Sequence, residues 1–79
     1  MELSYDPRHN IAYLRLRATA AEVETLRVSD EMNIDIAPDG TIYGIELLNA
    51  NTQLSGDQGR LVLVDKESGK RQEMRLPAA

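Results

Sequence analysis

The chain has no cysteine, tryptophan or phenylalanine, and only one histidine among its 79 residues. Without cysteine there is no disulfide or thiolate zinc site, and one imidazole cannot build a histidine metal site. We therefore expect no cofactor. The net charge is −4, and three tyrosines are the only aromatic residues. Because nucleic-acid binding needs a basic surface and uses aromatic rings for base stacking, nucleic acid is excluded as the expected partner.

Long apolar runs are missing as well. No segment approaches the ~20 consecutive apolar residues of a membrane-spanning helix, and no charged-then-apolar segment of the kind found in signal peptides opens the sequence. We therefore expect a cytoplasmic protein with no membrane partner, and the absence of cysteine agrees with a reducing compartment.

The length allows one domain, residues 1–79, with one small core. A single core of this size supplies only about 3–5 kcal/mol of stability. Since disulfides and metals are absent, self-association is the remaining source of stability, and we expect a homo-oligomer, most simply a dimer.

The acidic charge is unevenly distributed. Residues 1–56 carry nine acidic and four basic side chains, whereas residues 57–79 carry four acidic and five basic ones. An acidic body favours encounter with a basic protein partner. The alternative is that the charge only keeps the surface solvated.

The clearest pattern is a pair of alternating apolar and polar runs, 32–36 and 41–47, around the turn Pro38-Asp39-Gly40. A three-residue loop would pair Ala37 with Thr41 and put the two apolar sets on opposite faces. A four-residue loop pairs Ile36 with Thr41 and puts them on one face. Because a slip of one residue turns every side chain over, we predict the four-residue loop. The apolar face then contains Met32, Ile34, Ile36, Tyr43, Ile45 and Leu47.

Two more hairpins are predicted. Residues 3–5 and 11–16 flank a polar turn, and pairing Tyr5 with Ala12 gathers their apolar residues on one face. Residues 60–65 and 71–76 form the other. Its first strand is apolar on both faces, so we expect a neighbouring layer or a second subunit to cover it.

Residues 18–28 are ambiguous, because the capping pair Thr19 and Glu22 favours a helix whereas Val23, Thr25 and Leu26 favour a strand. We predict a strand over 23–29 with a bulge near Thr25-Leu26. One short helix is expected, at 18–27 or at 49–56. The fold class is therefore all-β: a mainly antiparallel meander of six or seven short strands.

The face opposite the predicted apolar one carries the best candidate site residues. Gly44 is the most suggestive of them, because a glycine inside a strand marks a bulge or a close approach by another group. The functional hypothesis is a shallow docking patch poor in side chains. The alternative is a ligand-binding, metal-binding or hydrolytic site using Asp35 and Glu46, although the spacing of Asp35 and Asp39 does not match a calcium loop. The candidate interaction patch comprises Asn33, Asp35, Ile42, Gly44 and Glu46.

No catalytic arrangement is evident elsewhere. His9 lies in a polar turn, and none of the four serines has a spacing that selects it as a nucleophile. The glycines of the 55–59 loop lack the lysine of a phosphate-binding loop. We therefore expect a non-enzymatic protein-interaction module.

Residues 5–54 resemble a family of small bacterial and archaeal proteins known as domain of unknown function 2283. The matching features are Tyr5-Asp6, Ala12-Tyr13-Leu14-Arg15-Leu16, Glu24-Thr25-Leu26-Arg27-Val28, Ile34-Asp35-Ile36, Asp39-Gly40 and Gly44-Ile45-Glu46-Leu47-Leu48. The 60–76 hairpin lies outside this pattern. Genes of the family can neighbour those of small toxin-like proteins, so the resemblance implies an antitoxin-like role.

Overall fold

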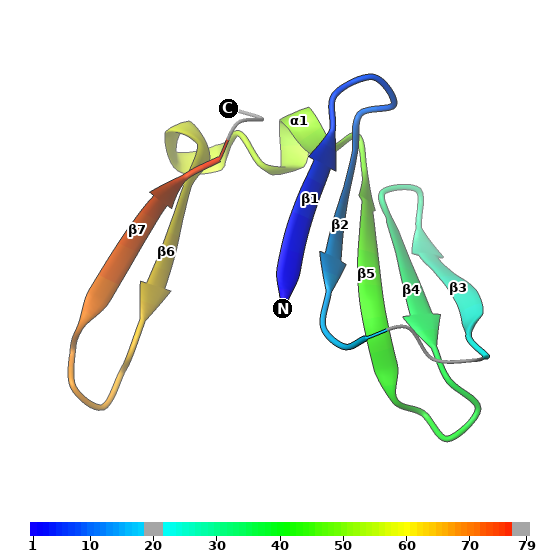
Figure 1. Ribbon diagram of the computed structural model, residues 1–79. Helices are drawn as coiled ribbons and strands as arrows, with labels where there is room; N and C mark the ends of the chain where they lie inside the picture. The colour runs from blue at the N-terminus through cyan, green and yellow to red at the C-terminus, as the bar shows by residue number, and fades with distance from the viewer. Residues whose placement is uncertain (19–21, 77–79) are drawn as a thin grey trace.

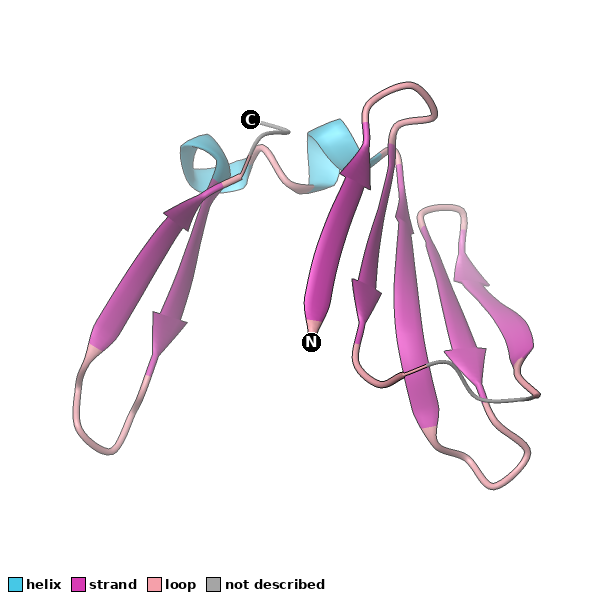
Figure 2. Cartoon of the chain, in the orientation of Figure 1, coloured by secondary structure: helices cyan, strands magenta, loops and turns pink. Residues whose placement is uncertain are grey.

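The computed structural model describes residues 1–18 and 22–76, which form seven strands in two antiparallel sheets (Figures 1 and 2). A short helix, α1 (Ala50–Gln53), and a 3-10 turn, η1 (Gly56–Gly59), join the two sheets. The all-β antiparallel class and the short helix near 49–56 are confirmed. The strands are β1 Glu2–Asp6, β2 Ile11–Arg15, β3 Glu24–Ser29, β4 Met32–Ile36, β5 Ile42–Leu48, β6 Arg60–Val64 and β7 Arg71–Arg75.

The larger sheet has the strand order β1-β2-β5-β4-β3. Strands β3, β4 and β5 form a meander, but the chain crosses from β2 to the far edge before β3 begins, so β5 returns to lie beside β2 (Figure 1). In the first hairpin Tyr5 pairs with Ala12 and Leu3 with Leu14, as predicted. The crossover brings β2 and β4 to either side of β5.

The ambiguous segment forms strand β3 from Glu24, so the strand prediction is confirmed and a helix reaching residue 27 is wrong. Residues 19–21 of that helix prediction lie outside the described residues. The bulge occurs later than predicted. The pairing shifts between Arg27 and Ser29, which makes Val28 the extra residue.

The β4–β5 turn corrects the predicted register. The backbone N–H of Ala37 donates to the carbonyl of Thr41 over 2.9 Å, and the N–H of Gly40 donates to Ala37 over 2.9 Å, so the loop has three residues. Gly40 has a φ of 91°, which favours glycine and closes this shorter loop. The prediction of a four-residue loop was wrong because it did not include a β-bulge in β5. The bulge leaves Tyr43 unpaired between the pairs Asp35–Gly44 and Ile36–Ile42.

This bulge brings most of the apolar residues back onto one face. Ile34 lies opposite Ile45 and Met32 opposite Leu47, so these four residues share a face as predicted. Alternation along β4 places Ile36, and with it Ile42, on the same apolar face. Tyr43 instead lines a hollow on the polar face. The predicted faces of Ile42 and Tyr43 are therefore exchanged.

The hydrophobic core is thin. Among the described residues the buried hydrophobic side chains are Ala12, Ala50 and Leu76, and the apolar face of the larger sheet is only half-buried. Many large apolar side chains are exposed. They include Val23, Leu26, Val28, Leu61, Leu63, Val64 and Met74. Within the described part of the chain, no second layer supplies the cover expected for β6.

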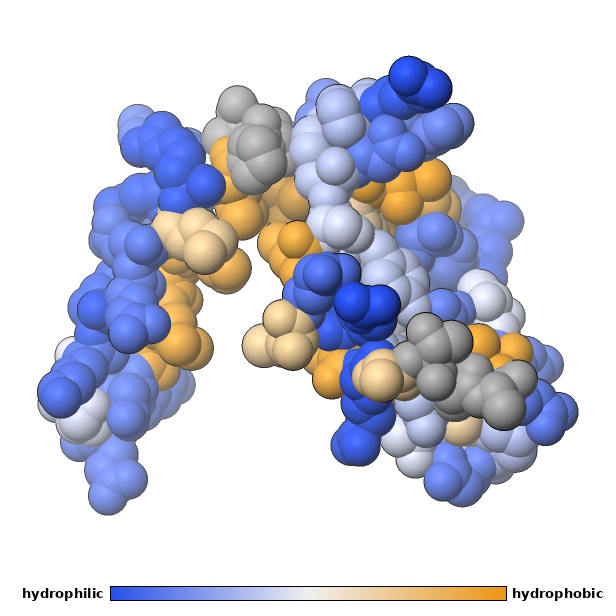
Figure 3. Space-filling model, in the orientation of Figure 1, coloured by the Kyte–Doolittle hydropathy of each residue, from blue (hydrophilic) through white to orange (hydrophobic). Residues whose placement is uncertain are grey.

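Strands β6 and β7 form the hairpin predicted for residues 60–76, with Leu61 opposite Met74 and Val64 opposite Arg71. Figure 1 shows this hairpin standing apart from the larger sheet, attached through α1 and η1. Figure 3 shows an open gap between the hairpin and the larger sheet, with apolar side chains along the side of the hairpin that faces the gap. No helix in the described ranges 1–18 and 22–76 is long and apolar enough to cross a membrane.

Candidate functional site

The polar face of the larger sheet carries two rows of paired side chains. One row runs Glu2, Arg15, Gly44, Asp35 and Thr25 across the five strands, and the next runs Ser4, Tyr13, Glu46, Asn33 and Arg27. Side chains on neighbouring strands of one face interact most strongly when they are opposite or diagonal. The two rows therefore bring together polar residues from segments that are far apart in the sequence.

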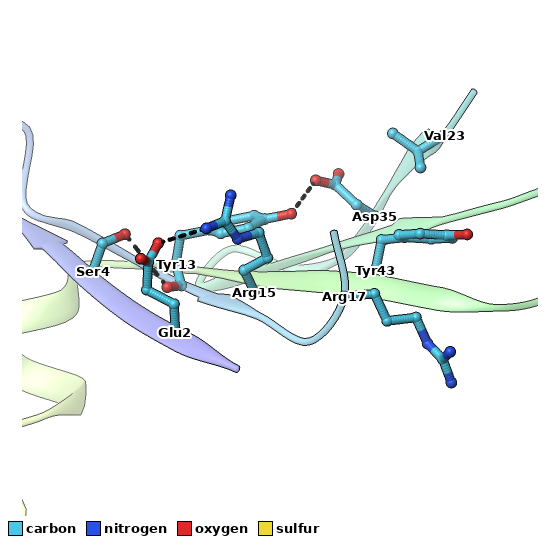
Figure 4. Close-up of a pocket in the computed structure, with 8 residues that line it drawn as sticks. All are labelled: Glu2, Ser4, Tyr13, Arg15, Arg17, Val23, Asp35 and Tyr43. Atoms are coloured by element: carbon cyan, nitrogen blue, oxygen red, sulfur yellow. Dashed lines mark hydrogen bonds and ion pairs between the residues drawn. The ribbon is translucent and has the colours of Figure 1, made fainter. Parts of the chain in front are cut away.

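Tyr13 and Thr25 hold Asp35 between them. The Tyr13 hydroxyl donates to Asp35 Oδ2 over 2.6 Å, and the Thr25 hydroxyl donates to Asp35 Oδ1 over 2.7 Å. The Tyr13 hydroxyl reaches from β2 across β5 to β4, as the close-up in Figure 4 shows. Hydrogen bonds to a carboxylate are stronger than those between neutral groups. These two bonds tie β2, β4 and β3 together across the sheet.

Gly44 allows this contact because the Tyr13 ring lies directly over it. A Cβ atom at position 44 would be 2.0 Å from Tyr13 Oη and 2.3 Å from Tyr13 Cζ. Gly44 itself is buried. The predicted patch is therefore not poor in side chains at its centre, since an aromatic ring covers the strand glycine as it does in other sheets.

The carboxylate also sets the acidity of Tyr13. The pKa of Tyr13 is raised to about 12, mainly by the hydrogen bond to Asp35 and then by partial burial and the negative charges of Asp35 and Glu46, against a smaller opposing effect of Arg15. At neutral pH Tyr13 is a protonated hydrogen-bond donor. It cannot act there as a phenolate nucleophile or base.

The other carboxylates of this face are also paired. Glu46 accepts a hydrogen bond from the Asn33 side-chain amide over 2.8 Å, and Glu2 lies 3.1 Å from the guanidinium of Arg15. Across residues 1–18 and 22–76, no group of three histidine, aspartate or glutamate side chains is placed to hold a metal ion. Asp35 and Glu46 are thus each engaged within the sheet.

An open hollow of about 370 Å³ lies beside this network. Figure 4 shows the Arg15 guanidinium beside Glu2 and the Tyr43 ring beyond Asp35. The lining combines two arginines, two carboxylates, two tyrosine rings, a serine and a valine, which is a mixed polar and apolar surface. The lining residues are Glu2, Ser4, Tyr13, Arg15, Arg17, Val23, Asp35 and Tyr43.

His9 lies away from this hollow, in the β1–β2 turn. His9 Nδ1 is 2.7 Å from Asp6 Oδ2, and the backbone N–H of Arg8 donates to Asp6 Oδ1 over 2.9 Å. The hydrogen bond with the His9 side chain lowers the pKa of Asp6, and the backbone N–H groups of Arg8 and His9 lower it further. The arrangement closes a turn, and both side chains are largely exposed.

Four of the five predicted patch residues lie together on the polar face. Asn33 is opposite Glu46, and Asp35 is opposite Gly44, whereas Ile42 is opposite Ile36 on the apolar side. The residues missed from the sequence are Tyr13, Thr25 and Tyr43. A glycine in one strand and an aromatic residue in another were the available signal, but linking them requires the strand order.

The fold and the polar face define a small antiparallel β protein with a hydrogen-bonded polar sheet surface. A family model described as "Protein of unknown function (DUF2283)" matches residues 2–51, well over half of the chain. The chain therefore belongs to that family, and the β6–β7 hairpin lies beyond the matched region. No curated protein and no solved structure matches the chain.

Proposed function

We propose that the chain is a non-enzymatic protein-interaction module that acts as a homodimer in the cytoplasm. The supporting observation is its exposed area of 6033 Å². A folded monomer of 8.8 kDa exposes about 4,800 Å². The radius of gyration of 14.1 Å likewise exceeds the ~12 Å of a compact chain of this length. The chain therefore exposes about 1,200 Å² more than a compact monomer, and several large apolar side chains are exposed, which favours association.

The polar face supports a binding role over a catalytic one. Both oxygens of Asp35 accept hydrogen bonds from its own sheet, Glu46 is bonded to Asn33, and Tyr13 stays protonated at neutral pH. A catalytic base or nucleophile needs an activating partner and a free proton acceptor. The polar face instead offers fixed charged and hydrogen-bonding groups to a partner surface.

We further propose that a heterologous partner is a basic protein, of which a toxin bound in an antitoxin-like manner is one example. The support is charge, because residues 1–56 carry a net charge of −5. Electrostatic attraction raises association rates and depends on salt. Capture of a basic partner should therefore weaken with rising salt, and capture that is unaffected by salt contradicts this part of the proposal.

Sedimentation equilibrium of the full chain tests the dimer. We expect twice the 8.8 kDa chain mass at micromolar concentration, and a chain that stays monomeric there contradicts self-association. The alternative ligand site is tested by a thermal-shift screen with divalent metals and metabolites. An increase in Tm that Asp35→Asn or Glu46→Gln abolishes would favour the alternative over the interaction module.

A further inference from the structure

The β6–β7 hairpin presents an apolar face whose large side chains are about half or more exposed. Leu61 and Leu63 of β6 and Met74 of β7 lie on this face, with Leu61 directly opposite Met74. Their exposed fractions are 49%, 67% and 62%. Val62 and Val64 belong to the other face, among charged residues. An isolated two-stranded hairpin with such a face is marginally stable in water and requires packing against another element.

The larger sheet presents a matching surface. Its apolar face brings Leu14, Ile34 and Ile45 together at the centre, and Leu14 and Ile34 lie on either side of Ile45. In the described chain, β6 and β7 make their extensive contacts with each other and not with this sheet. Antiparallel sheets with one apolar face are stable when that face is packed on another layer.

The attachment of the hairpin holds it away from its own sheet. The side-chain amide of Gln53 donates to the carbonyl of Glu31 over 2.9 Å and also to that of Leu48, which fixes α1 to the sheet. At the base of the hairpin, the N–H of Leu76 donates to the carbonyl of Gly59 over 2.8 Å, and Leu76 is buried. These contacts anchor α1 to the sheet and close the base of the hairpin, and a second copy can reach the hairpin as it stands.

Area and charge both favour a second copy as the occupant. Two copies that each bury the excess of about 1,200 Å² would bury about 2,400 Å² in total, which lies in the range of obligate homodimers. The segment 57–79 has a net charge of +1 and residues 1–56 a net charge of −5. The hairpin segment of one copy is therefore attracted to the sheet segment of another.

We propose that two copies exchange hairpins: the apolar face of β6–β7 in each copy packs on the apolar face of the five-stranded sheet in the other. This inference rests on the proposed homodimer and specifies its interface. It gives the dimer two equivalent contacts, each between different surfaces of the two copies. In a dimer that pairs hairpin with hairpin, or sheet with sheet, each contact is instead between two copies of the same surface.

Complementation between two variants tests the exchange. Leu61→Gln/Leu63→Gln disables the hairpin surface, and Ile34→Gln disables the sheet surface, so neither variant alone retains an intact contact. We expect each to weaken dimerisation at least about 100-fold. The matched control, Val64→Gln on the other hairpin face, should leave dimerisation within a few-fold of the unmodified chain. A 1:1 mixture of the two disabled variants should form dimers, because one intact hairpin–sheet contact is restored.

The outcomes are distinct. If the unmodified chain is dimeric but the mixture forms no more dimer than either variant alone, the exchange is overturned and the proposed dimer stands. An unmodified chain that is monomeric overturns both.

If Ile34→Gln loses its circular dichroism signal, cysteine cross-linking replaces it, since the chain has no cysteine of its own. Differently tagged copies with Leu63→Cys and with Ile34→Cys, Ile45→Cys or Leu14→Cys are mixed and oxidised. A mixed disulfide with at least one sheet position supports the exchange, and its absence at all three overturns it.

Discussion

Replacing Gly44 by alanine tests the contact that ties three strands of the polar face together. The new Cβ would lie 2.0 Å from Tyr13 Oη and 2.3 Å from Tyr13 Cζ, so the ring has to leave its position over β5. The displaced phenol then loses its 2.6 Å hydrogen bond to Asp35. A hydrogen bond to a charged group contributes about 1.5–3 kcal/mol. Removing a glycine from a strand interior regains roughly 0.5–1 kcal/mol.

The net expectation is a loss of about 1–2 kcal/mol in the free energy of unfolding, or roughly 5–15 °C in Tm for a domain of this size. A double-mutant cycle isolates the cause. In a Tyr13→Ala background there is no ring to displace, so Gly44→Ala should stabilise the protein by roughly 0.5–1 kcal/mol. The coupling energy between the two positions is then about 1.5–3 kcal/mol.

Urea denaturation of the four proteins at one fixed protein concentration measures this coupling. The fixed concentration matters because association changes apparent stability. An effect of Gly44→Ala that is equal in both backgrounds would refute the reasoning, because it would mean that the Tyr13 ring does not occupy the space above Gly44.

Three further predictions concern single residues. The folded-state pKa of Tyr13, about 12, exceeds its unfolded value near 10, so the Tyr13–Asp35 bond stabilises the fold below pH 10 and this contribution is lost as the pH rises from 10 to about 12. In urea melts at alkaline pH, Tyr13→Phe should therefore lose less stability over this pH range than the unmodified chain. An alkaline stability profile that Tyr13→Phe leaves unchanged would contradict the bond. Gly40 has a φ of 91° with open space around it, so Gly40→Ala should cost about 1–2 kcal/mol through backbone strain alone, and a neutral substitution would argue against the three-residue loop. Asn10 has a φ of 56°, its Oδ1 accepts a hydrogen bond from the Asn51 N–H over 2.8 Å, and its Nδ2 donates to Asn51 Oδ1 over 2.7 Å. Asn10→Gly should cost about 1–2 kcal/mol of stability in hydrogen bonds, and Asn10→Ala roughly 1 kcal/mol more because of backbone strain. Equal losses of stability in the two variants would show that backbone strain plays no part.

The positions of the strands could be predicted from alternation, and so could the pairing of Tyr5 with Ala12. The β4–β5 hairpin shows the limit of that reasoning. Requiring a common apolar face placed Met32, Ile34, Ile45 and Leu47 together correctly, but the turn chemistry of Pro38-Asp39-Gly40 sets a shorter loop. With a three-residue loop alone, the apolar residues of the two strands would lie on opposite faces, and a bulge brings most of them back to one face. The alternation of apolar and polar residues does not predict which residue the bulge will leave unpaired.

The candidate site was predictable only in part, for a topological reason. Asp35, Gly44 and Glu46 are close in sequence, and one hairpin brings them together. Tyr13 reaches Asp35 only because β5 lies between β2 and β4. That order follows from the crossover between β2 and β3, which are consecutive in the chain but not neighbours in the sheet, and the alternation of any single segment does not encode it.

The central claim is that this fold is completed by association. The dependence of Tm on protein concentration tests it most directly, because a dimer that unfolds to two chains gains stability by mass action. A 100-fold rise in concentration adds about 2.7 kcal/mol per dimer. With roughly 2 cal/mol/K of unfolding entropy per residue, two 79-residue chains should melt about 8 °C higher. A Tm that stays constant across that range would contradict the account.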